Sequence, residues 1–132
     1  DFGKAACVRE GSRATVVTWG DMVYRSMEAI DLLGGDIELI DLRTIVPWDE
    51  EMVLESVRKT SRCLIVHEDG ITAGFGAEIS ARITQECFAH LDAPVRRCAV
   101  RDIPVPYNKS LMAAVVPTTE TVTQEIRTVL SW

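Results

Sequence analysis

The chain has 132 residues, of which 47% are hydrophobic and 26% charged, and its formal net charge is -6 at neutral pH. These proportions exclude a disordered or fibrous class, and the length supports one globular domain with its own core over residues 1–132. The acidic balance argues against a general nucleic-acid or anionic-membrane surface, because binding to phosphate requires clustered Lys and Arg; a basic partner fits better.

The first predicted elements are two short apolar segments, 5–9 and 14–19, on either side of the turn-like group 10–13. This pattern predicts a small β-hairpin at the start of the domain. Apolar residues then recur at helical spacing over 22–33, and Gly34-Gly35 ends that pattern. We therefore expect an amphipathic helix after the hairpin.

The middle of the chain continues with alternating strand and helix patterns. Segment 37–42 is predicted to be a strand, and the next helix begins near Asp49. Asp49 suits the N-cap position because its carboxylate can accept a hydrogen bond from the first helical turn. Segment 62–66 is another predicted strand, followed by a glycine-containing loop and a helix that ends near residue 89.

Three further segments complete the chain. Segment 95–100 is predicted to be a strand, 103–107 is irregular because its two prolines lack backbone donors, and 118–130 is a helix. The resulting order is β-β-α-β-α-β-α-β-α. Such alternation is typical of a three-layer α/β/α sandwich in which helices cover both faces of a mainly parallel sheet.

Residues with possible chemistry follow the predicted strand at 62–66. His67, Glu68 and Asp69 offer a base and two carboxylates at the carboxyl end of that strand, where α/β enzymes often carry catalytic groups. The alternative is that these residues satisfy loop amides or line an interface, since no second histidine lies nearby. No complete catalytic set is identified, and His67 and Glu68 are the only candidates.

The group Gly74-Phe75-Gly76 is similar to part of a dinucleotide-binding loop. However, Ile79 occupies the position of the third glycine in Gly-x-Gly-x-x-Gly, so no cofactor-binding residue is predicted. The alternative function of these glycines is tight packing of the helix start against the sheet.

The four cysteines, Cys7, Cys63, Cys87 and Cys98, are widely spaced and show no Cys-x-x-Cys pattern, so we predict buried thiols and no metal site. Neither a Gly-x-Ser-x-Gly elbow nor a matched Cys and His pair is present. Free thiols favour a reducing, cytoplasm-like compartment. No apolar run approaches the roughly 18 residues that a membrane-spanning helix requires, and no signal peptide is expected.

Six motifs occur in order along the chain: Gly3-Lys4-Ala5, Leu42-Arg43-Thr44-Ile45-Val46-Pro47-Trp48-Asp49, His67-Glu68, Gly74-Phe75-Gly76-Ala77-Glu78-Ile79, Leu91-Asp92-Ala93-Pro94 and Pro104-Val105-Pro106-Tyr107. Together they resemble the C-terminal domain of the E1 beta subunit of 2-oxo acid dehydrogenase complexes, of the branched-chain or pyruvate type. The segment from His67 to Pro94 is more similar to the branched-chain type.

This resemblance implies a transketolase C-terminal-like fold with five strands, mostly parallel, and one antiparallel edge strand. It also implies a parent oxidoreductase that uses thiamine diphosphate and magnesium to decarboxylate a 2-oxo acid and to acylate the lipoyl group of an E2 acyltransferase. In that family the cofactor lies between two other domain types. The present domain, expected to be part of a longer E1 chain because it begins at Asp1 without Met, should then bind no cofactor and not be catalytic alone.

The resemblance further implies a role in assembly. The expected partners are the E1 alpha subunit or region, a second E1 beta subunit, and the basic peripheral subunit-binding domain of E2, in the cytoplasm or the mitochondrial matrix. Asp92 and the chain end at Trp132 match positions used for docking E2, because a carboxylate can hold an arginine side chain. The alternative for Asp92 is an exposed loop acid, and for Trp132 a frayed tail.

Ile71 and Phe75 are large apolar residues on a glycine-rich loop and are predicted to contact another subunit. The alternative is that they form a lid over the domain's own core. Two other functions remain open at this point: the equivalent domain of another thiamine enzyme, such as transketolase or deoxyxylulose-phosphate synthase, or a stand-alone small-molecule-binding α/β domain that uses the loop from His67 to Gly76.

Overall fold

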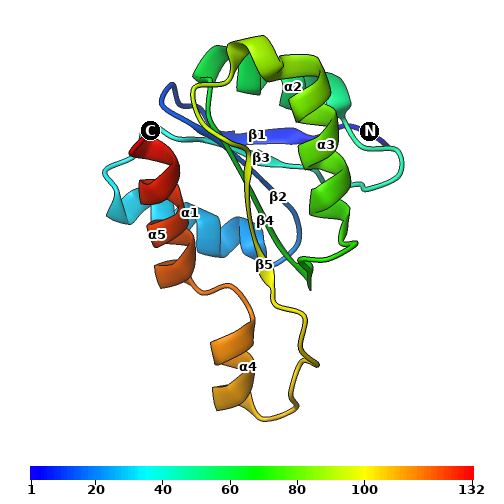
Figure 1. Cartoon of the computed structure of the whole chain (residues 1–132), viewed down its shortest axis with the longest axis vertical. Helices are drawn as coiled ribbons and strands as arrows, with labels where there is room; N and C mark the ends of the chain where they lie inside the picture. The colour runs from blue at the N-terminus through cyan, green and yellow to red at the C-terminus, as the bar shows by residue number, and fades with distance from the viewer.

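The computed structural model describes residues 1–132 and shows one sheet with helices on both faces (Figure 1). The strands are β1 (Ala6–Arg9), β2 (Thr15–Thr18), β3 (Glu38–Asp41), β4 (Cys63–Gly70) and β5 (Arg96–Val100). The helices are α1 (Met22–Leu32), α2 (Glu50–Thr60), α3 (Phe75–Cys87), α4 (Lys109–Val115) and α5 (Thr119–Leu130), with a 3-10 helix at Phe88–His90. None of these helices is both long and apolar enough to span a membrane.

The sheet has the strand order β1-β3-β2-β4-β5. β1 runs antiparallel to β3 at one edge, and the other neighbours are parallel. The predicted three-layer sandwich with five strands and one antiparallel edge strand is therefore confirmed. Parallel pairing on both sides of β2 explains why this strand is buried along its whole length.

The two faces of the sheet carry separate hydrophobic clusters because successive side chains of a strand point to opposite sides. Along β4, Leu64 and Val66 pack with residues of α1 and α5, such as Ile30 and Ile126. Cys63 and Ile65 instead belong to the cluster formed with α2 and α3. An uninterrupted apolar strand thus indicates a central position with helices on either side.

The predicted hairpin between the first two strands is wrong. β1 pairs with β3, and the connection between β1 and β2 crosses the chain just before β3. At the crossing, the backbone N–H groups of Ser12 and Arg13 donate to the Asp36 carbonyl oxygen, at N···O distances of 3.3 and 3.2 Å. Gly11 permits this approach, since a Cβ there would lie 2.3 Å from the Ile37 carbonyl carbon. β3 consequently lies between the two strands.

Asp49 caps α2 as predicted. Its Oδ1 accepts a hydrogen bond from the backbone N–H of Met52 at 3.4 Å, and its Oδ2 accepts one from Ala5 at 3.1 Å. The buried carboxylate therefore satisfies an amide of the first helical turn and also fixes the residue that precedes β1. One side chain joins a helix start to the edge strand.

Two differences from the predicted elements concern the carboxyl side of the sheet. β4 does not end at Val66 but continues through His67, Glu68 and Asp69 to Gly70, with a register shift against β5 after Val66. The region 101–116, of which only 103–107 was predicted, as an irregular proline segment, contains α4, which projects from the body of the domain (Figure 1). No residue of α4 is buried, so the core periodicity that marks the other helices is missing there.

Candidate functional site

His67 is fully buried and packs as part of the domain interior. Its ring stacks on Trp19 with centroids 5.2 Å apart and an interplanar angle of 7°. Neither ring nitrogen has a hydrogen-bond partner. Burial lowers the pKa of His67, and the nearby Asp69, which acts in the opposite direction, does not compensate. The imidazole is therefore held neutral and away from solvent, an arrangement that supports packing rather than proton transfer.

The glycines after His67 are explained by the same packing. A Cβ on Gly76 would lie 2.2 Å from the Nε2 atom of His67, and one on Gly74 would lie 2.0 Å from the Gly70 carbonyl oxygen. Only glycine allows the start of α3 to approach β4 this closely. The space that a nucleotide phosphate would need beside these glycines is filled by the His67 ring and the strand backbone.

The two apolar loop residues that were predicted to contact another subunit lie in different surroundings. Phe75 is half-buried and makes edge contacts with Trp19 and Trp48, at centroid distances of 5.9 and 6.3 Å. It therefore covers the cluster between the sheet and α2. Ile71 is also half-buried, but its backbone N–H donates to Val100 at 2.8 Å and it lines a cavity at the end of β5.

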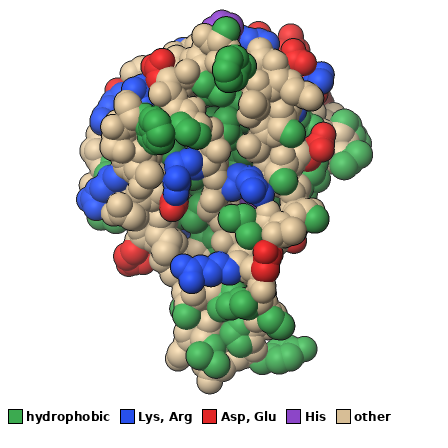
Figure 2. Space-filling view, viewed as in Figure 1, with side chains coloured by type: hydrophobic (Ala, Val, Ile, Leu, Met, Phe, Trp, Pro, Cys, Tyr) green, Lys and Arg blue, Asp and Glu red, His purple; other side chains and the backbone are tan.

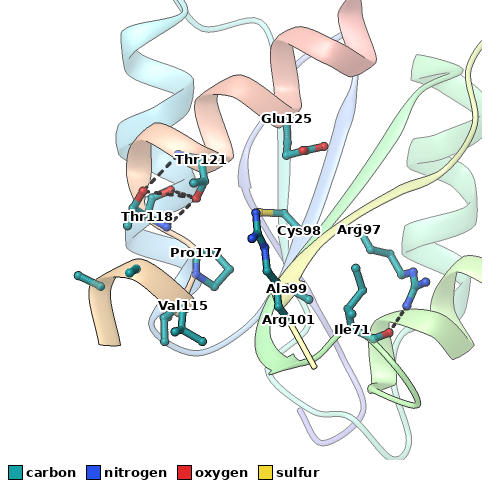
Figure 3. Close-up of a pocket in the computed structure, with 13 residues that line it drawn as sticks. Ile71, Arg97, Cys98, Ala99, Arg101, Val115, Pro117, Thr118, Thr121 and Glu125 are labelled. Atoms are coloured by element: carbon teal, nitrogen blue, oxygen red, sulfur yellow. Dashed lines mark hydrogen bonds between the residues drawn. The ribbon is translucent and has the colours of Figure 1, made fainter. Parts of the chain in front are cut away.

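That cavity, of about 390 Å³, lies between β5, α4 and the start of α5 (Figure 3). Arg97 reaches away from it and donates to the Ile71 carbonyl oxygen, and Arg101 extends beside Cys98. The start of α5 is already capped, because Thr118 and Thr121 hydrogen-bond reciprocally. Burial raises the pKa of the Cys98 thiol to about 11, so this cysteine stays protonated at neutral pH and is a poor nucleophile.

The region 101–116, here called the arm, carries an exposed apolar surface that sequence patterns missed. Figure 2 shows hydrophobic side chains gathered on this projection. The large exposed residues on it are Ile103, Val105, Tyr107, Leu111 and Met112. Asn108 could have indicated α4 in the sequence, because asparagine is a favoured N-cap residue. Its side-chain oxygen accepts hydrogen bonds from the backbone N–H groups of Ser110 and Leu111 at N···O distances of 2.9 and 3.4 Å.

A surface groove of about 640 Å³ brings together Asp92 and Trp132, which are 40 residues apart in sequence. Both side chains are largely exposed, at 61% for Asp92 and 62% for Trp132. The groove is mainly apolar and contains one acidic side chain. Its lining residues are Thr84, Phe88, Leu91, Asp92, Ala93, Pro94, Val95 and Trp132.

Arg62 lies behind this groove and contacts both of its ends. Its Nη2 donates to the Trp132 carbonyl oxygen at 3.0 Å, and its Nη1 lies 3.7 Å from Oδ2 of Asp92. The backbone of Asp92 is fixed separately, because its N–H donates to the Ser61 carbonyl oxygen at 2.8 Å. Sequence analysis did not identify Arg62, since nothing near it in the sequence indicates partners 30 and 70 residues away.

Residues that could bind a metal are not clustered: no group of three or more His, Cys, Asp or Glu side chains is placed to hold an ion. Cys63, Cys87 and Cys98 are buried free thiols, as predicted, whereas Cys7 is exposed. The donor set therefore does not fit magnesium.

Comparison with known proteins identifies the domain type. The family model "Transketolase, C-terminal domain" matches residues 3–122. The chain is 48% identical over 104 residues to the 2-oxoisovalerate dehydrogenase subunit beta of Pseudomonas aeruginosa, covering 79% of this chain and 30% of that protein. It is 38% identical over 131 residues to the pyruvate dehydrogenase E1 component subunit beta of Rickettsia conorii, covering 97% of this chain and 40% of that protein.

The chain thus spans well under half the length of these curated relatives. Among solved structures, a split gene transketolase described as an inactive beta4 tetramer superposes with a TM-score of 0.80 at 22% identity, covering 99% of this chain and 42% of that one. This likeness shows the fold, and the family model covers most of the chain. The chain therefore belongs to the transketolase C-terminal domain family.

Proposed function

We propose that this chain is the assembly and E2-docking domain at the C-terminus of an E1 beta subunit in a 2-oxo acid dehydrogenase complex. The names of its relatives at 38% and 48% identity support this assignment, and those relatives are branched-chain and pyruvate enzymes. The parent enzyme would use thiamine diphosphate and magnesium. Because the family resemblance implies that this cofactor lies between two other domain types, we assign its site to other parts of the parent.

The arm supports the assembly role. Its helix α4 has seven residues, none of them buried, and helices this short are marginal in water without packing partners. The apolar side chains of the arm form a contiguous exposed surface, a property typical of protein interfaces. We assign this surface to contact with the E1 alpha subunit or a second E1 beta subunit, and Ile71 at its base extends the same contact.

The groove carries the docking role. It offers apolar side chains around one exposed acidic side chain, Asp92, which suits a partner whose arginine or lysine is flanked by apolar residues. The net charge of -6 would attract such a basic partner and orient its approach. The peripheral subunit-binding domain of an E2 acyltransferase is the partner that the family resemblance implies, and the exposed Asp92 in this groove is the observation on which the proposal depends.

Titration of the chain with the E2 peripheral subunit-binding domain from the same genome, by calorimetry at low and moderate salt, tests this function. Binding should be saturable and weakened by salt, and Asp92→Asn should lower the affinity about tenfold or more, as loss of one charge-assisted hydrogen bond predicts. Asp31→Asn on α1 is the matched control, because it removes one equally exposed carboxylate away from the groove. Equal affinity of wild type and the Asp92 variant would contradict docking at this groove.

The other two functions receive less support. Similarity to the split gene transketolase is confined to the fold at 22% identity, whereas the dehydrogenase subunits are 38% to 48% identical. A stand-alone ligand-binding function would need space in the loop from His67 to Gly76, which is filled by the His67 ring.

A further inference from the structure

We propose that Arg62 is the positioning residue of the docking groove, holding the end of α5 and the loop that carries Asp92 in the arrangement a basic partner recognises. This inference rests on the docking function proposed above. A different terminal nitrogen of the guanidinium faces each end of the groove, and no other hydrogen bond or ion pair joins these two ends. Arg62 is therefore placed to fix the spacing between them.

The contacts of the guanidinium indicate that Arg62 holds Asp92 in position and does not compete with a partner for its carboxylate. The Nη2 bond to the Trp132 carbonyl oxygen, at 3.0 Å, has ordinary hydrogen-bond length. The 3.7 Å separation between Nη1 and Oδ2 of Asp92 is too long for a hydrogen bond, so it orients the carboxylate without occupying its lone pairs. Asp92 consequently keeps its acceptor sites for an incoming cation.

Burial of Arg62 supports the same role. Its side chain is only 24% exposed, and its Nε atom is buried without a hydrogen-bond partner. A buried donor without a partner is unfavourable, so the Nε atom of Arg62 lowers the stability of the fold. A fork of two terminal nitrogens can bridge acceptors that a single ammonium group cannot reach in the same geometry.

The bridge also explains how Trp132 becomes part of a binding surface. This residue follows the last turn of α5, its side chain is 62% exposed, and the Arg62 bond restrains its backbone. Without that bond the backbone at Trp132 would sample more conformations, and ordering it on binding would cost affinity. With the bond, one wall of the groove is formed before the partner arrives.

Calorimetric titration of the full chain with the same E2 peripheral subunit-binding domain, using Arg62→Ala and Arg62→Lys, tests the proposal. Both variants should bind about tenfold more weakly than wild type, because Lys keeps the charge but cannot form the two-point bridge. Arg43→Ala is the matched control: it removes the same charge from an exposed arginine after the carboxyl end of β3, the opposite end of the parallel strands.

A second measurement separates positioning from a general loss of stability. The heteronuclear ¹⁵N NOE of the Trp132 backbone amide should fall in both Arg62 variants and stay at the wild-type value in the Arg43 variant. Tighter binding by Arg62→Ala would show that Arg62 competes for Asp92, and wild-type affinity in either variant would overturn the bridge. Weak binding with an unchanged Trp132 NOE would also overturn it. Failure of the wild-type chain to bind would instead refute the docking function.

Discussion

At the scale of single residues, the buried His67 makes the stability of the domain depend on pH. Burial keeps its pKa below the usual value of about 6.5, so between these two values the unfolded chain binds a proton that the folded chain does not. The free energy of unfolding is therefore not reduced by His67 above pH 6.5. It falls as the pH drops from 6.5 toward the folded-state pKa, because protonation then favours the unfolded chain.

This sign leads to a measurable expectation. Between pH 7.5 and 5.5 the wild-type chain should lose stability in urea denaturation, and His67→Phe, which keeps a ring against Trp19 and cannot be protonated, should lose less. His90→Gln is the control, because it removes the other histidine of the chain, which is exposed and does not pack in the core. An identical pH dependence in wild type and His67→Phe would contradict this account.

Gly76 is the complementary residue on α3. Its Ala variant places a Cβ 2.2 Å from Nε2 of His67, so the ring or the helix must move, and we expect a loss of about 1–3 kcal/mol in the free energy of unfolding. Gly70→Ala is the matched control, since its nearest neighbour to a new Cβ is the Thr72 carbonyl oxygen at 3.7 Å. Comparison of urea midpoints measures the difference; similar midpoints for the two variants would show that the His67 ring does not fill this space.

At the scale of elements, α4 differs from the other main helices because none of its residues is buried. A paired variant, Ile103→Ser with Leu111→Ser, removes exposed apolar groups and should change the free energy of unfolding by less than about 0.5 kcal/mol. Co-purification with the E1 alpha subunit should nevertheless be lost. Leu32→Ser, an exposed leucine on α1, is the control that should retain the subunit. Retention by the paired variant would refute the arm as an assembly surface.

The edge strand shows a second property of elements. The local sequence of β1 and β2 satisfies the pattern of a hairpin, but β1 instead completes the sheet beside β3. The bond from Ala5 to the Asp49 carboxylate and the crossing at Gly11 fix this position. Strand pairing was mispredicted because both contacts join residues more than 20 positions apart.

At the scale of the whole molecule, the two proposed surfaces lie at opposite ends of the sheet. The groove lies just before β5 and at the end of α5, whereas the arm follows the carboxyl end of β5. Figure 1 accordingly shows the C-terminus far from α4. The Asp92 variant should therefore retain assembly with E1 subunits, and the paired arm variant should retain E2 binding.

The two proposed surfaces differ in the kind of contact that they offer. Contacts between subunits can be formed by apolar residues of the arm, while the net charge of -6 acts over the rest of the surface to attract a basic domain. Higher salt should thus weaken binding of E2 more than it weakens assembly, because screening acts on exposed charges and not on apolar burial.

The amino-acid sequence by itself determined the layers of this protein. The apolar run Leu64, Ile65 and Val66 and the helical spacing of Ile79 and Ile83 identify elements whose local periodicity records which sides are buried. The motifs from Gly3 to Tyr107 also identified the family. Only the tertiary structure decided where β1 pairs, that Gly76 packs against His67, that α4 is part of the arm, and that Arg62 contacts both Asp92 and Trp132. These features depend on contacts between distant parts of the chain, which local periodicity does not record.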